Sequence, residues 1–276
     1  TNGHRGAGAG TIWHAAGLTR KSEWSVIPVG GFDDRPDEKN PGGIAHLDAQ
    51  AKDLGSFGRI AETARRGGRL LWYPGQVDVS IRPGWFYHAA EDDKVKTLDH
   101  LLDIYYTSVG GNAQLLLNIP PDKRGRIHEN DARRLKELGV RLRATFSVDL
   151  ATQMGYSLNG SNSNTVIERD LAGPKIFNVA MIQEDLRRGQ RIEAFAIDAW
   201  NGNEWKEIAR GTTIGWKKLL RFPAVETTKV RLRILKERGM PSTGMSTGCL
   251  MDPPGGFGLF FDTARVETGE RTAERH

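Results

Sequence analysis

The stretch Gln114-Leu-Leu-Leu-Asn-Ile119, closed by Pro120-Pro121, decides the fold of the region around it. A short continuous apolar run that ends at prolines is typical of a strand buried on both faces, as strands of parallel sheets are. Apolar residues recur at helical spacing on both sides of this run, over 95–109 and over about 130–146. The pattern therefore predicts a buried strand between two helices.

The same alternation continues upstream. Residues 60–64 have a helical pattern, and residues 69–73 have the composition of a strand. Helices and strands in turn are typical of α/β architecture. We therefore predict that residues 70–73 and 114–119 are parallel strands.

Beyond about residue 150 the pattern changes from helical stripes to short strands. Residues 157–164 are rich in turn formers, and residues 229–234 alternate basic with apolar side chains. Such alternation indicates strands with one buried and one wet face, as in an antiparallel β-sandwich. We therefore predict two domains, 1–150 and 151–276. The strands predicted in the second domain cover 177–182, 192–200, 205–208, 217–222 and 229–234.

Composition excludes several classes of protein. The 276 residues are 38% apolar and 26% charged, which is a globular composition. The net charge is +5, but acidic residues are interspersed with the basic ones, so we expect no nucleic-acid partner. No stretch approaches the roughly 20 apolar residues of a membrane helix, and no export signal stands at Thr1–Gly10, so we expect no membrane partner. The lone Cys249 can form no internal disulfide and has no partners of suitable spacing for a zinc site, and we expect no metal or cofactor.

Three segments carry an unusual density of reactive and aromatic residues: 20–25, 73–88 and 115–125. A carboxylate beside Trp and Arg, with further aromatics nearby, suits sugar hydrolysis, which needs an acid of tuned pKa and flat apolar faces. Taken alone, Glu23 is also compatible with a surface glutamate, and the aromatics at 85–87 with a core. Residue types and spacing do not separate these alternatives.

A family resemblance favours the hydrolase. The motif Arg20-Lys-Ser-Glu23-Trp24-Ser25, the run from Asp78 to His88 (Asp-Val-Ser-Ile-Arg-Pro-Gly-Trp-Phe-Tyr-His) and Leu115–Asp122 resemble the catalytic barrel of α-L-fucosidases. These are retaining glycoside hydrolases, and the fit is close to their 1,3/1,4-linkage subfamily. The second half resembles the β-sandwich that follows the barrel in many members. The resemblance implies the C-terminal part of a (β/α)8-like barrel followed by an antiparallel, galactose-binding-like β-sandwich.

The resemblance also implies roles for particular residues. Glu23 corresponds to the acid/base glutamate, in a mechanism that needs two carboxyl groups roughly 5–5.5 Å apart. Packing against Trp24 favours its protonated form, whereas Arg20 favours the ionised form. Trp85 offers an apolar plane to the ring or methyl group of fucose. The expected substrate-binding residues are Arg20, Trp24, Gln76, Asp78, Trp85 and His88.

The sequence departs from the family pattern at three places. No segment resembles the Asp-Gly nucleophile motif, Ile12 stands before Trp13 where members have Arg, and Gln76 stands where most have Glu. We therefore expect an acid/base half that releases no fucose by itself, from a full-length protein that is extracellular or periplasmic and acts on fucosylated oligosaccharides or glycoconjugates.

The alternative is a non-catalytic carbohydrate-binding protein built on the sandwich, with a remnant barrel. Trp200, Trp205 and Trp216 are candidates for stacking on sugars, but tryptophans on strands are more typical of a core. We expect the sandwich to bind glycans weakly at most.

Overall fold

The computed structural model describes the following residues: 12–15, 23–29, 56–151, 156–159, 165–186, 189–237 and 257–263. The chain divides into two compact units after Asp131. The sequence-based boundary at residue 150 remains a prediction about domains. The two units are described separately below.

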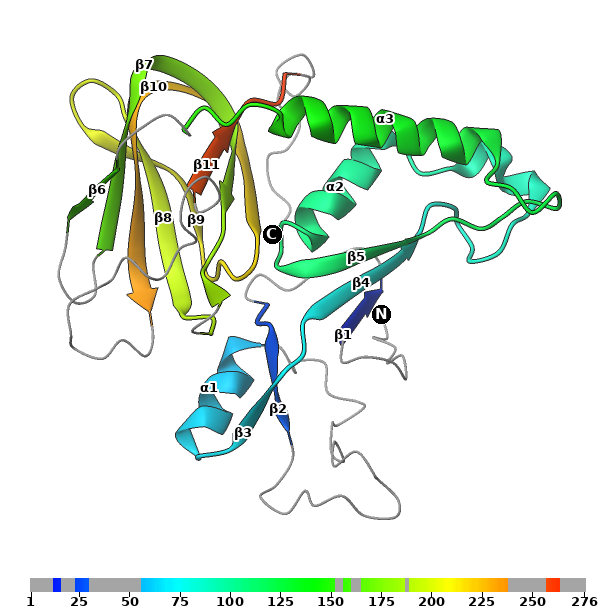
Figure 1. Cartoon of the computed structure of the whole chain (residues 1–276), viewed down its shortest axis with the longest axis horizontal. Helices are drawn as coiled ribbons and strands as arrows, with labels where there is room; N and C mark the ends of the chain where they lie inside the picture. Colours follow the sequence, from blue (N-terminus) through cyan, green and yellow to red (C-terminus); the bar gives the residue numbers. More distant parts are fainter. Residues whose placement is uncertain are drawn as a thin grey trace. The chain divides into compact units, whose positions relative to one another are not determined.

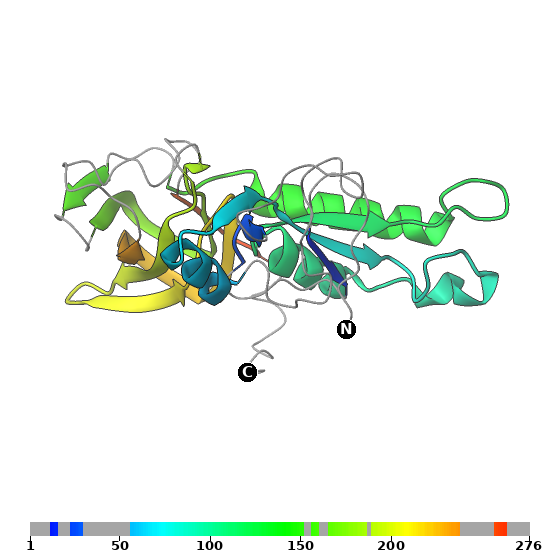
Figure 2. The ribbon, with the colours of Figure 1, turned by 90° about the horizontal axis from the view of Figure 1, so that it is seen from below.

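The first unit contains a parallel sheet in the order β1-β4-β5, formed by Ile12–Ala15, Gly75–Ser80 and Ala113–Asn118. Figures 1 and 2 show these strands side by side. The predicted strand at 114–119 is confirmed as β5, but its burial on both faces was predicted wrongly, because Leu116 is 42% exposed. Leu116 lies opposite Asp78 of β4, on a face that also carries polar side chains and is therefore no apolar interface.

The predicted strand at 70–73 exists but has a different partner. It is β3, Arg69–Trp72, and it pairs antiparallel with β2, Val26–Val29, in a separate sheet. Its prediction as a parallel strand is therefore wrong. The physical reason is that β2 pairs with the backbone groups of β3, and this pairing continues past the strand to Tyr73, whose N–H donates to Ser25 O at 2.9 Å. The parallel neighbour of β5 is instead β4, which follows β3 directly in the chain.

All three predicted helices are confirmed. They are α1, Phe57–Arg65; α2, Leu98–Ser108; and α3, Glu129–Phe146, which runs through the division at Asp131. A short 3₁₀ helix, η1, covers Ala89–Lys94. The Thr97 side chain accepts from the His100 backbone N–H at 3.2 Å and so caps α2. Within the described ranges, no helix has the length and apolar character needed to cross a membrane.

The second unit contains one antiparallel six-stranded sheet, in the order β11-β7-β10-β8-β9, with β6 paired to β7. The strands are β6 Tyr156–Asn159, β7 Thr165–Ile182, β8 Ile192–Trp200, β9 Trp205–Gly211, β10 Lys218–Glu237 and β11 Phe257–Phe260. The predicted antiparallel pairing is confirmed, and the strands predicted at 217–222 and 229–234 are parts of β10, which has register shifts between them. One face buries Phe177, Phe195 and Leu232. Trp216 lies in a turn between β9 and β10, is 56% exposed and is therefore outside this core.

The strand β11 pairs with β7, from which it is distant in the sequence. Its four residues are buried and pair with Val179–Ile182 at the end of β7. Leu259 of β11 also bonds to the segment after α3: its N–H donates to Asp149 Oδ1 at 2.9 Å, and the Leu259 carbonyl accepts from Leu150 N–H at 2.8 Å. These bonds fix β11 both to the sheet and to the segment that follows α3.

Candidate functional site

Strand β4, Gly75–Ser80, carries two of the predicted binding residues, Gln76 and Asp78. Side chains alternate along a strand, so both lie on the face opposite Val77, which is fully buried. Oδ1 of Asp78 is buried and has no hydrogen-bond partner among the described residues. Burial raises the pKa of Asp78. Asp78 therefore holds an unused hydrogen-bonding group on the polar face of the sheet.

The chain beyond β4 forms a loop, residues 81–96, that is closed at its neck. Lys96 N–H donates to Ile81 O at 2.9 Å. The Lys96 ammonium donates to Ser80 O at 2.6 Å and to Arg82 O at 3.2 Å. Burial lowers the pKa of Lys96. These three bonds hold the two ends of the loop together at the carboxyl end of β4.

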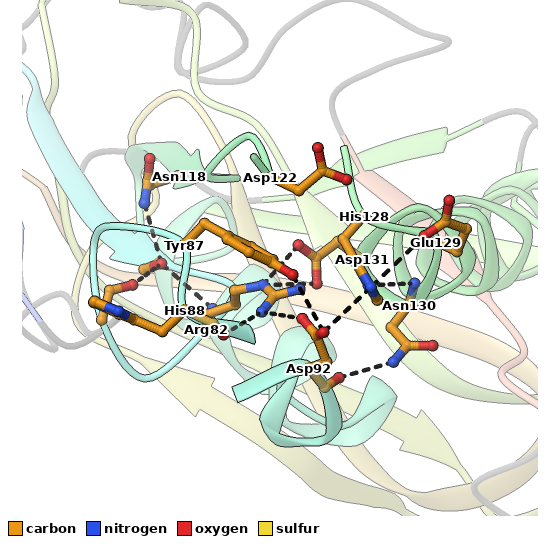
Figure 3. A network of polar contacts seen from close by, with 12 residues as sticks. Arg82, Tyr87, His88, Asp92, Asn118, Asp122, His128, Glu129, Asn130 and Asp131 are labelled. Atoms are coloured by element: carbon orange, nitrogen blue, oxygen red, sulfur yellow. Dashed lines mark hydrogen bonds and ion pairs between the residues drawn. The ribbon is translucent and has the colours of Figure 1, made fainter. Parts of the chain in front are cut away.

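A buried arginine fills the inside of this loop (Figure 3). The guanidinium of Arg82 donates through Nε to Asp131 Oδ2 at 2.8 Å and through Nη1 to Asp92 Oδ1 at 2.9 Å. Its Cζ lies 4.8 Å from the ring centroid of Tyr87. Burial alone would lower the pKa of Arg82, but Asp131 and Asp92 outweigh it and raise that pKa. Arg82 is thus a permanent buried cation held between two carboxylates.

The tip of the loop is fixed by strand ends as well. Asn118, the last residue of β5, donates from Nδ2 to Ser80 Oγ at 3.1 Å and to Trp85 O at 2.9 Å. Ser80 Oγ in turn donates to Gly84 O at 2.7 Å. The indole of Trp85 is nevertheless 49% exposed and Phe86 is 78% exposed. The alternative that these two aromatics form a core is therefore wrong.

His88 belongs to the same loop. Its side chain is exposed, and its carbonyl accepts from Arg82 Nη1 at 3.4 Å. The ring of Tyr87 is half-buried and donates from its hydroxyl to Asp92 Oδ2 at 3.3 Å. The structure therefore brings Trp85 and His88 together on one loop.

The turn after β5 is stabilised separately. Asp122 accepts from the backbone N–H groups of Arg124 at 2.7 Å and Arg126 at 3.2 Å. The ion pair with the Arg124 guanidinium holds the pKa of Asp122 at about 2. Arg124 also contacts Glu129 at 2.7 Å. This cluster, with Asp122 buried and Arg124 and Glu129 exposed, stabilises the turn after β5.

Glu23 and Trp24 lie at the other end of the strands. Glu23 is buried, and its carbonyl accepts at 2.9 Å from Nδ2 of Asn112, the residue before β5. Trp85 is bonded to Asn118, which lies six residues along the chain from Asn112, or about 20 Å in an extended strand. The structure therefore does not bring Glu23 together with Trp85. Trp24 is also buried, and Arg20 lies outside the described residues.

Sequence reasoning missed the residues that organise the loop. Arg82 and Asn118 stand inside the quoted motifs, but no role was predicted for them. Asp131 lies 49 residues from Arg82, and an acidic residue in the first turn of a helix is ordinarily explained by the helix dipole. No local signal links the two. No cluster of His, Cys, Asp and Glu suited to a metal ion occurs in the parts of the chain that the structure describes.

Comparison with known proteins gives consistent matches. The family model described as Alpha-L-fucosidase matches residues 57–145, which include the loop and β5. "Putative alpha-L-fucosidase 1" of Oryza sativa subsp. japonica is 36% identical over 223 residues, which are 71% of this chain and 41% of that protein. "Alpha-L-fucosidase 1" of Arabidopsis thaliana is 37% identical over 200 residues, 62% of this chain and 39% of that protein.

Solved structures agree. A putative alpha-L-fucosidase from Bacteroides ovatus matches with a TM-score of 0.72 and 38% identity, over 96% of this chain and 42% of that one. A glycoside hydrolase 29 family member from an unknown rumen bacterium matches with a TM-score of 0.69 and 28% identity, over 98% and 43%. The fold and sequence are thus those of a glycoside hydrolase family. The chain belongs to the alpha-L-fucosidase family, as the sequence motifs predicted, and spans about two fifths of the length of these relatives.

Proposed function

We propose that the whole protein is a retaining α-L-fucosidase that removes terminal α-1,3- or α-1,4-linked L-fucose from oligosaccharides or glycoconjugates. The observation that carries the proposal is the loop 81–96, which presents an exposed Trp85 at the carboxyl ends of parallel strands, inside the segment that matches the family model. Carboxyl ends of parallel strands are where barrel enzymes assemble their sites. In the same proposal, the parallel sheet is part of a (β/α)8-like barrel and the antiparallel sheet is a β-sandwich.

The loop and β4 supply the chemistry that a deoxy sugar needs. L-Fucose has hydroxyl groups and one methyl group, so a binding site needs both polar partners and an apolar plane. Trp85 offers the plane, and Oδ1 of Asp78, which has no hydrogen-bond partner among the described residues, offers a partner to a hydroxyl. His88 is exposed on the same loop, and Gln76 shares the face of Asp78. We propose these four as substrate-binding residues.

The acid/base role of Glu23 rests on the sequence motif alone. Its burial and its place beside Asn112 favour a structural role. The substitution Glu23→Gln separates the two roles in the whole protein, because Gln keeps the backbone carbonyl and the side-chain volume. On an unactivated glycan, a structural Glu23 leaves the turnover of Glu23→Gln within about tenfold of wild type, whereas loss of a general acid lowers it by about 10²–10⁴-fold.

Binding to the chain Thr1–His276 tests the proposal directly. Methyl α-L-fucoside is titrated by calorimetry or followed by saturation-transfer NMR, with methyl α-L-galactoside as the matched control that adds one hydroxyl at C6. We expect the fucoside to bind better and Trp85→Ala to abolish the preference. Equal binding of both sugars, or an unchanged preference in Trp85→Ala, would refute the assignment of Trp85.

We further propose that this chain alone releases no fucose, because its sequence has no segment resembling the nucleophile motif. A covalent mechanism without its nucleophile loses orders of magnitude in rate. Steady release of nitrophenol from an aryl α-L-fucoside by the purified chain would contradict this.

One observation favours the alternative of a carbohydrate-binding protein. Trp216 is 56% exposed in the second unit, where it could stack on a sugar. If the antiparallel sheet is the binding site, Trp216→Ala abolishes glycan binding by the chain and Trp85→Ala does not. The opposite result supports the site on the loop.

A further inference from the structure

The buried ion pair between Arg82 and Asp131 connects the loop 81–96 to the start of α3. We propose that this pair is a positioning pair for sugar binding: it holds the loop in the one conformation that presents Trp85. The inference rests on the proposed function, because it assigns a role in binding the same sugar.

Arg82 links the interior of the loop to a residue outside it. Inside the loop, its guanidinium contacts the Asp92 carboxylate at 2.9 Å and the His88 carbonyl at 3.4 Å, and it lies over the ring of Tyr87. Outside the loop, Nε contacts both carboxylate oxygens of Asp131, at 3.2 and 2.8 Å. A planar guanidinium can serve partners in several directions at once, which an ammonium on a flexible stem does less well. The loop conformation therefore depends on Arg82 in particular.

Asp131 matters because of burial. The side chains of Arg82 and Asp131 are both fully buried, whereas Asp92 is partly exposed. Removing one charge of a buried pair leaves the other without compensation, which is far more costly than losing an exposed pair. Without the Asp131 charge, the guanidinium gains by moving toward Asp92 and water. The loop that surrounds it then moves as well.

Trp85 and Phe86 have little packing of their own to resist this movement. Both side chains are largely exposed, so the polar bonds of the backbone hold the tip: Asn118 to Trp85 O and Ser80 to Gly84 O. A site that is held rigid before the ligand arrives loses less entropy on binding, and this advantage disappears when the loop is mobile. Loss of the Asp131 charge should therefore weaken sugar binding through the loop, although Asp131 itself touches no sugar.

The experiment compares Asp131→Asn and Arg82→Lys with a matched control, Glu129→Gln, in the full chain. Glu129 precedes Asp131 by two residues, pairs with Arg124 at the surface and lies 3.6 Å from Nε2 of His128. The control therefore removes a neighbouring exposed charge that has no direct bond to Arg82 among the described residues. Two measurements are made: hydrogen exchange of the peptide covering 83–88, and the affinity for methyl α-L-fucoside. We expect Asp131→Asn and Arg82→Lys to speed exchange at 83–88 and to weaken binding by about tenfold, with exchange in β8 unchanged. Glu129→Gln should change neither, and Asp131→Glu should restore part of the affinity.

The outcomes separate the inference from the proposed function. Unchanged exchange at 83–88 in Asp131→Asn overturns the inference whatever the sugar does. Faster exchange with unchanged affinity also overturns it, because the pair is then only structural. If the wild-type chain binds no fucoside, the proposed function fails and the positioning role fails with it. Exchange that rises equally in β8 means general unfolding and likewise overturns the inference.

Discussion

Glu184→Gln is predicted to remove a pH dependence from the stability of the second unit. Glu184 is fully buried, and its carboxylate accepts from the backbone N–H groups of Arg191, Ile192 and Gly215, the last two at 3.1 and 3.2 Å. Burial raises the pKa of Glu184 to about 7, although these three bonds oppose the shift. Desolvation therefore outweighs three hydrogen bonds at this site.

The magnitude follows from the difference between folded and unfolded pKa values. The ordinary pKa is 4.5 and the folded value is about 7, which corresponds to about 3 kcal/mol at 1.36 kcal/mol per unit. The folded state binds this proton more tightly than the unfolded state does. The stabilisation is therefore complete below the unfolded pKa of 4.5 and is lost as the pH rises to about 7. The amide of the Glu184→Gln variant does not titrate, so this slope should be absent from the variant.

The assay is urea denaturation across this pH range, read by hydrogen-exchange mass spectrometry of the peptide covering β8 so that the second unit is followed by itself. The quantity of interest is the free energy of unfolding of wild type minus that of Glu184→Gln. We expect this difference to fall by about 3 kcal/mol from pH 4.5 to about 7 and then to level off. A difference that is constant over this range, or that rises with pH, would refute the reasoning.

Three further predictions concern single substitutions. Burial alone would raise the pKa of Asp198, but hydrogen bonds from two arginines outweigh it and lower that pKa. Asp198→Asn should therefore lower the free energy of unfolding by about 3 kcal/mol at neutral pH and by less as the pH falls through the acid range. An equal loss at all pH values in urea denaturation would contradict this. Gly211→Ala would place a Cβ 2.5 Å from the Phe195 ring, so thermal unfolding should show a loss of about 1–3 kcal/mol, and an unchanged melting temperature would argue against the contact. Asn112 has φ +68°, a backbone conformation that Gly adopts without strain and Ala does not. Both Asn112→Ala and Asn112→Gly lose the side-chain bond to Glu23, so Asn112→Ala should destabilise the first unit by about 1–2 kcal/mol more than Asn112→Gly. Equal losses would mean that the backbone conformation carries no strain.

Helices were predictable from the sequence because each follows from local spacing. The apolar stripes near Leu101 and in 130–146 gave the type and approximate ends of α2 and α3. Strand pairing was less predictable because it depends on distant residues. The segment Arg69–Trp72 has the composition of a strand, but no local feature indicates that Val26–Val29 is its partner. Strand β4 was not predicted at all, since its alternation of Gly, Gln, Val, Asp, Val and Ser is only weakly apolar.

The site was predictable where a motif is contiguous and unpredictable where the fold assembles it. Trp85 and His88 stand in one unbroken run and indeed share one loop. Glu23 and Trp85 stand in separate motifs, and the structure puts them at opposite ends of the strands. Arg82 and Asp131 meet only because the chain returns to the end of β4 after 49 residues. Spacing along a sequence contains no information on such a meeting.

The late position of β11 in the chain has a consequence during synthesis. Residues 179–182 of β7 are completed 75 residues before Phe257, their partner in β11, emerges. At about 5–20 residues per second, the ribosome needs about 4 to 15 s for this stretch. Throughout that interval the edge of β7 has unpaired backbone groups beside the apolar Val179 and Ile182, a combination that invites pairing with other nascent chains. Chaperones that bind extended apolar segments should therefore associate with this chain before Phe257 is made, and should be released once β11 closes the edge.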